Sequence, residues 1–222
     1  MILCLVTDRR RLGAAVGARP DEFLDALEAQ VVAAARAGID YVQIREPDLE
    51  AAALTALVRS IAFKCRGTPT KILVNDRVDV ALAAKAAGVQ LKESSFLPAD
   101  VRRLAPSGFV IGCSVHTAVT ATARRSADFL IAGTIMPTVS KQPADYLEWK
   151  GLETVIGAAH GTPVLGIGGL DLSSIPRLAS SGAAGLAAVG AFIPTVGQGP
   201  SEFVQKRVID MRFAFDSARR EP

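Results

Sequence analysis

The sequence is poor in aromatic residues, which make up 5% of its 222 positions, whereas hydrophobic residues as a whole make up 50%. Its core must therefore be built mainly from Val, Ile, Leu and Ala. Such a composition suits a parallel sheet buried on both faces better than a β-sandwich. A chain of this length commonly forms one α/β barrel. We therefore expect a single domain over residues 1–222.

Cysteine is also scarce. Cys4, Cys65 and Cys113 are odd in number and far apart, and the sequence contains no CxxC pair. We therefore interpret all three as small, buried hydrophobic side chains.

Long hydrophobic runs and blocks of one charge are absent. No segment approaches the roughly 18 consecutive apolar residues of a membrane-spanning helix. The opening MILCLVTDRRR has its charges after the apolar run, the reverse of a secretory signal. The formal net charge of +3 is spread along the chain, whereas nucleic-acid binding calls for a clustered basic patch. We expect a cytoplasmic protein with neither a membrane nor a nucleic acid as partner.

What the sequence does contain is a regular alternation of short apolar runs and longer amphipathic segments. Eight such units can be counted. Alternating strands and helices predict parallel strands joined by right-handed crossovers. Eight units, without a GxGxxG after the first run, favour a closed (β/α)8 TIM barrel over an open doubly wound sheet. The expected strands start near Ile2, Tyr41, Lys71, Gly88, Phe109, Asp128, Pro163 and Gly185.

Several segments between these runs have helical spacing. RVDVALAAKAAG is expected to be helical up to a stop at Gly88, PADVRRL to begin at Pro98, and a last helix over about 201–217 to close the ring. A closed barrel has no free sheet edge, so a homo-oligomer would have to use helix faces or loops. The helix that starts near Asp21 should bury one face, made of Phe23, Leu24, Leu27, Val31 and Ala35.

Polar side chains stand at the C-terminal ends of the expected strands, where barrel enzymes carry their active sites. In YVQIR, alternation directs Gln43 and Arg45 into the barrel mouth and leaves Val42 and Ile44 toward the helices. An inward arginine favours ligand binding. The alternative is a structural pair with a carboxylate such as Glu46.

The next strands also end in polar residues. Asn75 and Asp76 follow KILV and either cap the next helix or face the site. Ser114 closes the fifth strand. His116, two residues later, is interpreted as a packed or capping residue, with catalysis as the alternative.

Two glycine-containing loops predict a phosphate site. Gly168 and Gly169 follow the seventh strand, and Val189 and Gly190 follow the eighth. In such barrels the backbone N–H groups of these two loops often bind phosphate, and a side chain would keep the phosphate oxygens away.

A long loop after the sixth strand, from Met136 to about Leu147, is a candidate binding loop. It carries two hydroxyls and a cation that could hold phosphate or pyrophosphate: Thr138, Ser140 and Lys141. The alternative is a solvated loop.

Five segments, VQIRE, ILVNDRVDVALAAKAAGVQL, IGCSVHTAVTA, ADFLIAGTIMPTVSK and PVLGIGGL, resemble in order the motifs of the thiamine phosphate synthase/TenI family. Members are (β/α)8 barrels. The synthase branch joins hydroxymethylpyrimidine pyrophosphate to a thiazole phosphate, with Mg²⁺ present, and releases pyrophosphate. The TenI branch binds the same thiazole phosphate and catalyses its aromatising tautomerisation.

The resemblance implies a role for each matching residue. Gln43 and Arg45 would face the pyrophosphate, Asn75 the pyrimidine, and Asp76 would be a metal carboxylate. The pyrophosphate and thiazole side would be lined by Ser114, Thr138, Ser140 and Lys141. The thiazole phosphate would lie against Gly168, Gly169, Val189 and Gly190. The residues expected to be catalytic are Arg45, Asp76, Ser114 and Lys141.

The chain also departs from the synthase pattern. Pro47 stands where synthases have a lysine, and Ser95 stands where they have the second metal aspartate. Gln90 and Lys92 replace a histidine and a glycine of the same motif. A serine hydroxyl is a poorer Mg²⁺ ligand than a carboxylate, and Lys92 adds a like charge. Mg²⁺ is therefore expected only if the chain performs the synthase reaction.

VQLKESSFLP is closer to the TenI branch, so our leading hypothesis is a TenI-like protein that binds a thiazole phosphate and performs a proton shift. A TenI-type tautomerase carries a histidine where this chain has Thr134. The proton would then be moved by Asp76, Glu93, His116 or a water held by Thr134.

Two alternatives remain open. The first is a divergent synthase, in which Glu46 or Glu93 replaces the missing metal ligand or Lys92 takes over part of the metal's charge. The second is a non-catalytic carrier or regulator that senses a thiamin precursor. In every case the expected partner is a small phosphorylated molecule.

Overall fold

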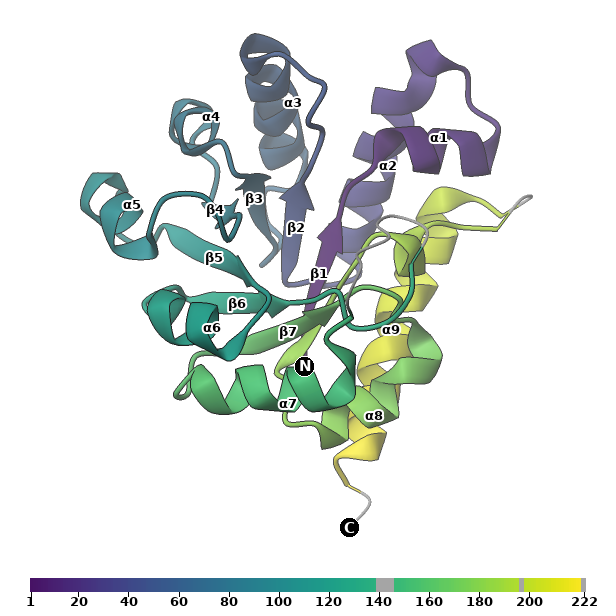
Figure 1. Ribbon diagram of the computed structural model, residues 1–222. Helices are drawn as coiled ribbons and strands as arrows, with labels where there is room; N and C mark the ends of the chain where they lie inside the picture. The colour runs from purple at the N-terminus through teal and green to yellow at the C-terminus, as the bar shows by residue number, and fades with distance from the viewer. Residues whose placement is uncertain (139–145, 196–197, 221–222) are drawn as a thin grey trace.

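The computed structural model describes residues 1–138, 146–195 and 198–220. Eight parallel strands form a closed barrel, in which each strand pairs with the next and the last pairs with the first (Figure 1). The predicted (β/α)8 TIM barrel is confirmed. The strands are β1 (Ile2–Val6), β2 (Tyr41–Ile44), β3 (Lys71–Asn75), β4 (Gly88–Leu91), β5 (Val110–Val115), β6 (Phe129–Ala132), β7 (Val164–Ile167) and β8 (Gly185–Ala188).

Helices cover the outside of this barrel (Figure 1). They are α1 (Arg9–Val16), α2 (Phe23–Arg36), α3 (Ala51–Lys64), α4 (Val78–Ala84), α5 (Pro98–Leu104), α6 (Ala118–Arg124), α7 (Glu148–Ala158), α8 (Ile175–Ser180) and α9 (Pro200–Ala218). The described chain also contains three short 3-10 helices: η1 (Pro20–Glu22), η2 (Leu172–Ser174) and η3 (Gly190–Phe192). No helix among these residues is long and apolar enough to cross a membrane.

The interior of the barrel is filled with apolar side chains at its lower end. Tyr41 and Phe129, the first residues of β2 and β6, stack with ring centroids 4.8 Å apart. A Cβ on Gly112 of β5 would come within 2.3 Å of the Phe129 ring, so glycine makes room for it. The other buried members of this layer are Cys4, Val6, Leu73, Ile131, Leu165 and Ala187. Toward the C-terminal ends of β2, β3, β4 and β5, polar side chains join this interior.

The predicted helix near Asp21 begins as η1 and continues as α2. Leu27, Val31 and Ala35 are buried as expected. The prediction for Leu24 is wrong, because its side chain is 38% exposed. The predicted start of α5 at Pro98 is confirmed.

The predicted helix stop at Gly88 is also wrong. Helix α4 ends at Ala84, and Lys85 takes the left-handed conformation that closes it, with φ of 54°. Gly88 instead begins β4, where a Cβ would come within 2.1 Å of the Val110 carbonyl oxygen on β5. Its glycine therefore serves the close approach of two strands.

The last helix joins the two ends of the strand order. Helix α9 packs against α2 and α8. Its Arg212 donates hydrogen bonds to the carbonyl oxygens of Met1 at 3.0 Å and Gly38 at 2.5 Å, and pairs with Asp40 at 2.8 Å.

The interpretation of the cysteines as small, buried side chains is confirmed, since Cys4, Cys65 and Cys113 are all buried and free.

Candidate active site

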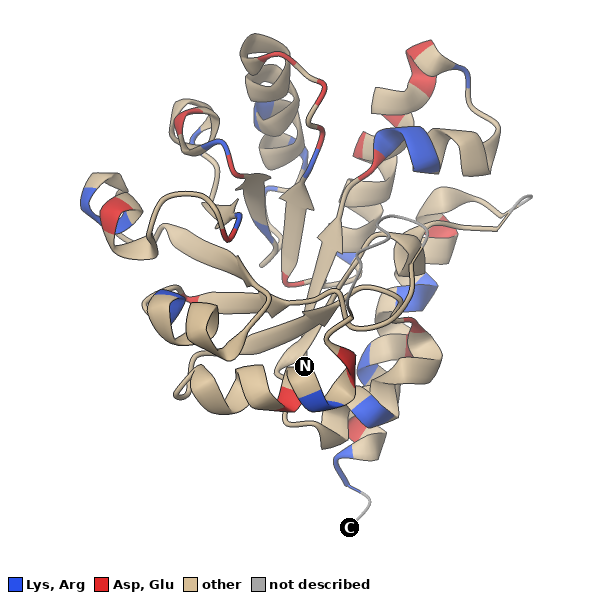
Figure 2. Cartoon of the chain, in the orientation of Figure 1, with Lys and Arg blue, Asp and Glu red and all other residues tan. Residues whose placement is uncertain are grey.

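The mouth of the barrel, formed by the C-terminal ends of the strands, has a charged half and a half that is neutral in the described residues. Figure 2 shows acidic and basic residues gathered where β1, β2, β3 and β4 end. The described residues of the loops after β5, β6 and β8 contain no Lys, Arg, Asp or Glu. A ligand in this mouth meets charged side chains on one side and mainly backbone and hydroxyl groups on the other.

A layer of amide side chains lies above the apolar layer. Gln43 on β2 is 5% exposed, and its Nε2 donates to Asn75 Oδ1 on β3 at 2.8 Å. Gln90 on β4 is 1% exposed, and its Nε2 donates to Ser114 Oγ on β5 at 3.3 Å. The strand alternation that predicted an inward Gln43 was therefore correct. Four neighbouring strands each contribute a hydrogen-bonding side chain to this layer.

Arg45 lies one residue beyond the end of β2, with an exposed side chain. Its backbone N–H donates to Thr7 Oγ1 at 2.8 Å, which fixes the start of this loop. Within the described part of the chain its guanidinium makes no hydrogen bond or ion pair. The alternative in which Glu46 satisfies Arg45 is wrong, because Arg9 takes that carboxylate. Arg45 is free to meet an anionic ligand.

Arg9 and Glu46 form the centre of a buried polar cluster. Glu46 accepts from Thr7 Oγ1 at 2.7 Å and from Arg9 Nη1 at 2.8 Å. Arg9 also donates one hydrogen bond of 2.6 Å to each carboxylate oxygen of Asp48. These bonds hold the pKa of Asp48 well below its ordinary value. Burial raises the pKa of Glu46, and the hydrogen bonds from Thr7 and Arg9 offset this only in part. The carboxylate of Glu46 is thus taken up by Thr7 and Arg9, and it is not positioned as a replacement metal ligand.

Asp76 takes a left-handed backbone conformation, with φ of 62°. The capping alternative for Asn75 and Asp76 is wrong: the N-cap of α4 is Arg77, which makes no side-chain cap. Asp76 Oδ2 instead pairs with Lys92 Nζ at 2.8 Å, and its Oδ1 accepts from the Lys92 backbone N–H at 3.3 Å. Partial burial would raise the pKa of Asp76, but hydrogen bonds from Lys92 and the Ser95 side chain outweigh it and lower the pKa.

These contacts test whether the side chains fit a Mg²⁺ ion. Mg²⁺ prefers carboxylate and phosphate oxygens in octahedral array. Here the Asp76 carboxylate is neutralised by the Lys92 ammonium, and Ser95 offers only a hydroxyl. No group of three or more His, Cys, Asp or Glu side chains within residues 1–138, 146–195 and 198–220 is arranged to hold a metal ion. The residues present do not fit the metal site that the family resemblance implies.

Glu93 and His116 bind each other between the loops after the adjacent strands β4 and β5. Glu93 Oε1 accepts from the His116 backbone N–H at 2.9 Å, and Oε2 lies 2.8 Å from His116 Nδ1. The N-cap of α6 is Thr117, so His116 itself does not cap the helix. Both Glu93 oxygens are therefore engaged, which leaves Glu93 no more available to a metal than Glu46.

Arg124, the last residue of α6, was not found from the sequence. Its side chain is buried, with the residue 7% exposed, and its guanidinium donates to the carbonyl oxygens of Glu93, of Ser95 at 3.1 Å and of Phe96 at 2.7 Å. Arg124 thus binds three carbonyls of the loop between β4 and α5, which holds Lys92. The only signal was a charged residue within an otherwise small and apolar helix, next to Arg125, which is exposed.

Gly168 and Gly169 both have left-handed backbones, with φ of 99° and 68°. A Cβ on Gly168 would lie 2.4 Å from Thr134 Cγ2, and one on Gly169 would lie 2.5 Å from the Pro137 carbonyl oxygen. Met136 N–H also donates to the Gly168 carbonyl at 3.0 Å. Glycine is needed here, as predicted, but the contact that demands it is with the loop after β6.

The remaining predicted residues lie around these loops. Gly190 begins η3, directly after Val189, and a Cβ on it would lie 3.4 Å from Arg11 Nη2, which sequence reasoning missed. Thr138 is partly exposed and ends the first described segment. The predicted residues Ser140 and Lys141 lie outside the described residues.

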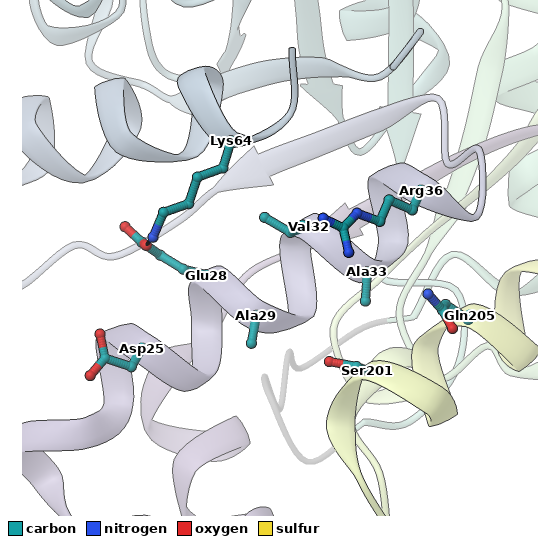
Figure 3. Close-up of a pocket in the computed structure, with 9 residues that line it drawn as sticks. All are labelled: Asp25, Glu28, Ala29, Val32, Ala33, Arg36, Lys64, Ser201 and Gln205. Carbon is teal, nitrogen blue, oxygen red and sulfur yellow. Dashed lines mark hydrogen bonds and ion pairs between the residues drawn. The ribbon is translucent and has the colours of Figure 1, made fainter. Parts of the chain in front are cut away.

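A further groove lies on the outer wall, away from this mouth. Its volume is about 410 Å³. On one side Lys64 of α3 reaches Glu28 of α2, and Ser201 and Gln205 of α9 form the other side (Figure 3). It contains none of the predicted site residues. We assign no ligand to it.

A TIM barrel with polar side chains and glycine loops at the C-terminal ends of its strands has the architecture of a barrel enzyme. The family model described as thiamine monophosphate synthase matches residues 5–192. The chain belongs to the thiamine phosphate synthase family, which confirms the resemblance seen in the sequence.

Individual relatives agree with this assignment. Thiamine-phosphate synthase of Roseiflexus castenholzii is 36% identical over 195 residues, which cover 86% of this chain and 81% of that protein. Thiamine-phosphate synthase of Methanospirillum hungatei is 34% identical over 158 residues, or 70% of this chain and 77% of that one. The solved structure of thiamine phosphate pyrophosphorylase from Pyrococcus furiosus superposes with a TM-score of 0.77 at 26% identity, covering 98% and 96% of the two chains.

Proposed function

We propose that the chain is a divergent thiamine-phosphate synthase, which condenses hydroxymethylpyrimidine pyrophosphate with thiazole phosphate. The proposal rests on the layer of hydrogen-bonding side chains at the mouth, which consists of Gln43, Asn75, Gln90 and Ser114. Arg45 and the glycine loops after β7 and β8 lie at the same end of the barrel. The names of the matched relatives support this alternative over the TenI-like hypothesis.

In the proposed reaction, the thiazole nitrogen forms a bond to the methylene carbon of the pyrimidine. The bond from that carbon to the pyrophosphate oxygen breaks, and pyrophosphate leaves with the electron pair. The pyrimidine lies on the amide layer, where Gln43 and Asn75 meet its ring nitrogens and amino group. Charge that develops on the leaving oxygen is stabilised by Arg45, whose guanidinium has no partner in the described part of the chain.

The thiazole phosphate takes the neutral half of the mouth. Its oxygens bind the backbone N–H groups of Gly168, Gly169 and Gly190 in the loops after β7 and β8. Arg11, close to Gly190, adds a guanidinium on the α1 side. The two substrates thus approach from opposite halves, which brings the thiazole nitrogen toward the methylene carbon.

A proton shift is less well supported. It needs a group that removes a proton and a second that delivers one. Asp76 is paired with Lys92, and Glu93 with His116, so each candidate base is already held by a cation or a hydrogen-bond donor. Thr134, which stands in the place of the tautomerase histidine, packs its methyl group toward Gly168.

The test is direct. Purified protein is incubated with both substrates, and thiamin phosphate is measured after oxidation to its fluorescent thiochrome. Product is expected, and Arg45→Met should lower kcat at least tenfold, while Arg207→Met on the outer face of α9 leaves it unchanged. Absence of product with both substrates at saturation would end the proposal. Thiazole phosphate binding without product would then indicate a carrier, and deuterium uptake into it a tautomerase.

A further inference from the structure

We infer that Lys92 provides, within the chain, the positive charge that binds a diphosphate, so that this mouth holds a diphosphate group without a divalent cation. The inference deepens the proposed function and rests on it for the identity of the substrate. It follows from the position of Lys92, from the loop that holds it and from the charges around it.

Lys92 directly follows β4 and stands beside the end of β3. Its Nζ lies 2.8 Å from Asp76 Oδ2, in contact with the carboxylate that the family resemblance assigns to a metal ion. The side chain is 60% exposed, so part of the ammonium faces the open mouth. An ammonium has three N–H donors, and one carboxylate contact leaves the others for a ligand.

Lysine is a flexible side chain, and here its backbone is fixed. Arg124 binds three carbonyls of the loop that follows Lys92, and the Glu93 side chain is bonded to His116. Asp76 is itself held, because its backbone N–H donates to the Gln90 carbonyl at 2.8 Å. The ammonium and its carboxylate therefore form a prepared pair, and less entropy is lost when a ligand binds.

The carboxylates at this point are already paired, so they leave little negative charge for a dication. The negative charge of Asp76 is balanced by Lys92, and Glu93 directs its carboxylate to His116. Arg45 then adds a second cation from the end of β2, on the other side of β3, with no partner among the described residues. A guanidinium after β2 and an ammonium after β4, on either side of β3, suit two phosphate groups in succession.

The experiment measures the affinity for inorganic pyrophosphate by calorimetry, once in EDTA and once in excess MgCl₂. Wild-type protein should bind it in EDTA with a Kd within about threefold of the value in MgCl₂. Lys92→Met should weaken binding in EDTA by about tenfold or more, because a charge-assisted hydrogen bond is lost. The matched control is Lys206→Met on α9, whose ammonium also pairs with an aspartate at 2.8 Å, and it should leave the Kd unchanged.

Lys92→Arg keeps the positive charge and tests whether that charge, rather than the shape of the loop, binds pyrophosphate. It should retain binding in EDTA, and thermal melts of all three variants should match the wild type. Binding of pyrophosphate only when Mg²⁺ is present would overturn the inference, as would an unchanged Kd for Lys92→Met in EDTA. The titration needs no turnover, so failure of the synthase assay with intact binding in EDTA would reject the proposed reaction and leave this site standing.

Discussion

The guanidinium of Arg124 donates a hydrogen bond of 2.7 Å to the carbonyl oxygen of Phe96, and through this contact α6 holds the loop that follows β4. The same guanidinium also binds the carbonyls of Glu93 and Ser95. A single buried side chain thus shapes the part of the mouth in which the chain differs most from the synthase pattern.

Replacing Arg124 should weaken both the fold and this loop. Arg124→Met leaves three carbonyl oxygens without their donor, and we expect the free energy of unfolding in urea to fall by about 3 kcal/mol. Pyrophosphate binding in EDTA should weaken as well, since Lys92 is no longer held. Arg125→Met is the control, because the neighbouring side chain is exposed and should matter little. Equal stability of the two variants would contradict the role given to Arg124.

The cluster around Arg9 predicts a dependence on pH. Asp48 has a lowered pKa in the folded state, so its contribution to stability is present above its unfolded pKa and is lost as the pH falls through the folded value. Glu46 has a raised pKa, so its charged form opposes folding as the pH rises. Arg9→Met removes the partner of both carboxylates. We expect a loss of about 3 kcal/mol at pH 7 that shrinks below about pH 4.

Urea unfolding of wild type and variant at pH 7 and at low pH measures this loss. Arg10→Met is a matched control, because Arg10 also contacts Asp48 but its side chain is 70% exposed. An exposed pair contributes little, about 0.5 kcal/mol or less. A penalty for Arg9→Met that does not change with pH would show that its packing, rather than its charge, supports the cluster.

Two glycines should respond in opposite directions to alanine. Gly169→Ala places a Cβ within 2.5 Å of the Pro137 carbonyl oxygen at a φ of 68°, and should cost about 2 kcal/mol and raise the KM for thiazole phosphate. Gly157→Ala, on the exposed face of α7 with no atom nearby, should raise stability by up to about 1 kcal/mol. Thermal unfolding and steady-state kinetics distinguish the two. If Gly169→Ala changes neither the stability nor the KM, the contact with Pro137 does not require glycine at this position.

Two substitutions should restore dependence on a metal. Lys92→Gly together with Ser95→Asp removes the competing ammonium and adds a second carboxylate beside Asp76. Pyrophosphate should then bind weakly in EDTA and at least tenfold more tightly with Mg²⁺. Lys92→Gly alone is the control, since it lacks the second carboxylate and should bind weakly in both. No response of the double variant to Mg²⁺ would mean that the metal site differs in more than these two positions.

Much of the fold was predictable because it depends on local pattern. The eight strands are short apolar runs buried on both faces, and alternation alone turns Gln43 inward. Leu24 was misassigned because helical spacing gives the direction of a face but not how far the neighbouring elements extend over it. The strand start at Gly88 was correct, but the helix stop placed there was wrong, because a glycine that ends a helix and a glycine that lets two strands approach look the same in sequence.

The site was less predictable because its contacts join residues that are far apart in the sequence. Arg9 and Glu46 are separated by 37 positions, and Arg124 reaches residues about 30 positions earlier. The sequence alone does not distinguish Arg124 from Arg125. Which of the two is buried depends on how α6 is rotated about its axis against the barrel. The pairing of Asp76 with Lys92 depends on the course of the loop that Arg124 holds.

The stacked rings of Tyr41 and Phe129 close the lower end of the barrel, and this has a kinetic consequence. With the floor sealed, every ligand enters and leaves through the same opening. A ring that rests on the amide layer is covered by whatever occupies the loops above it. For the proposed reaction, the pyrimidine substrate should therefore bind before the thiazole phosphate, and initial-rate kinetics should be ordered rather than random.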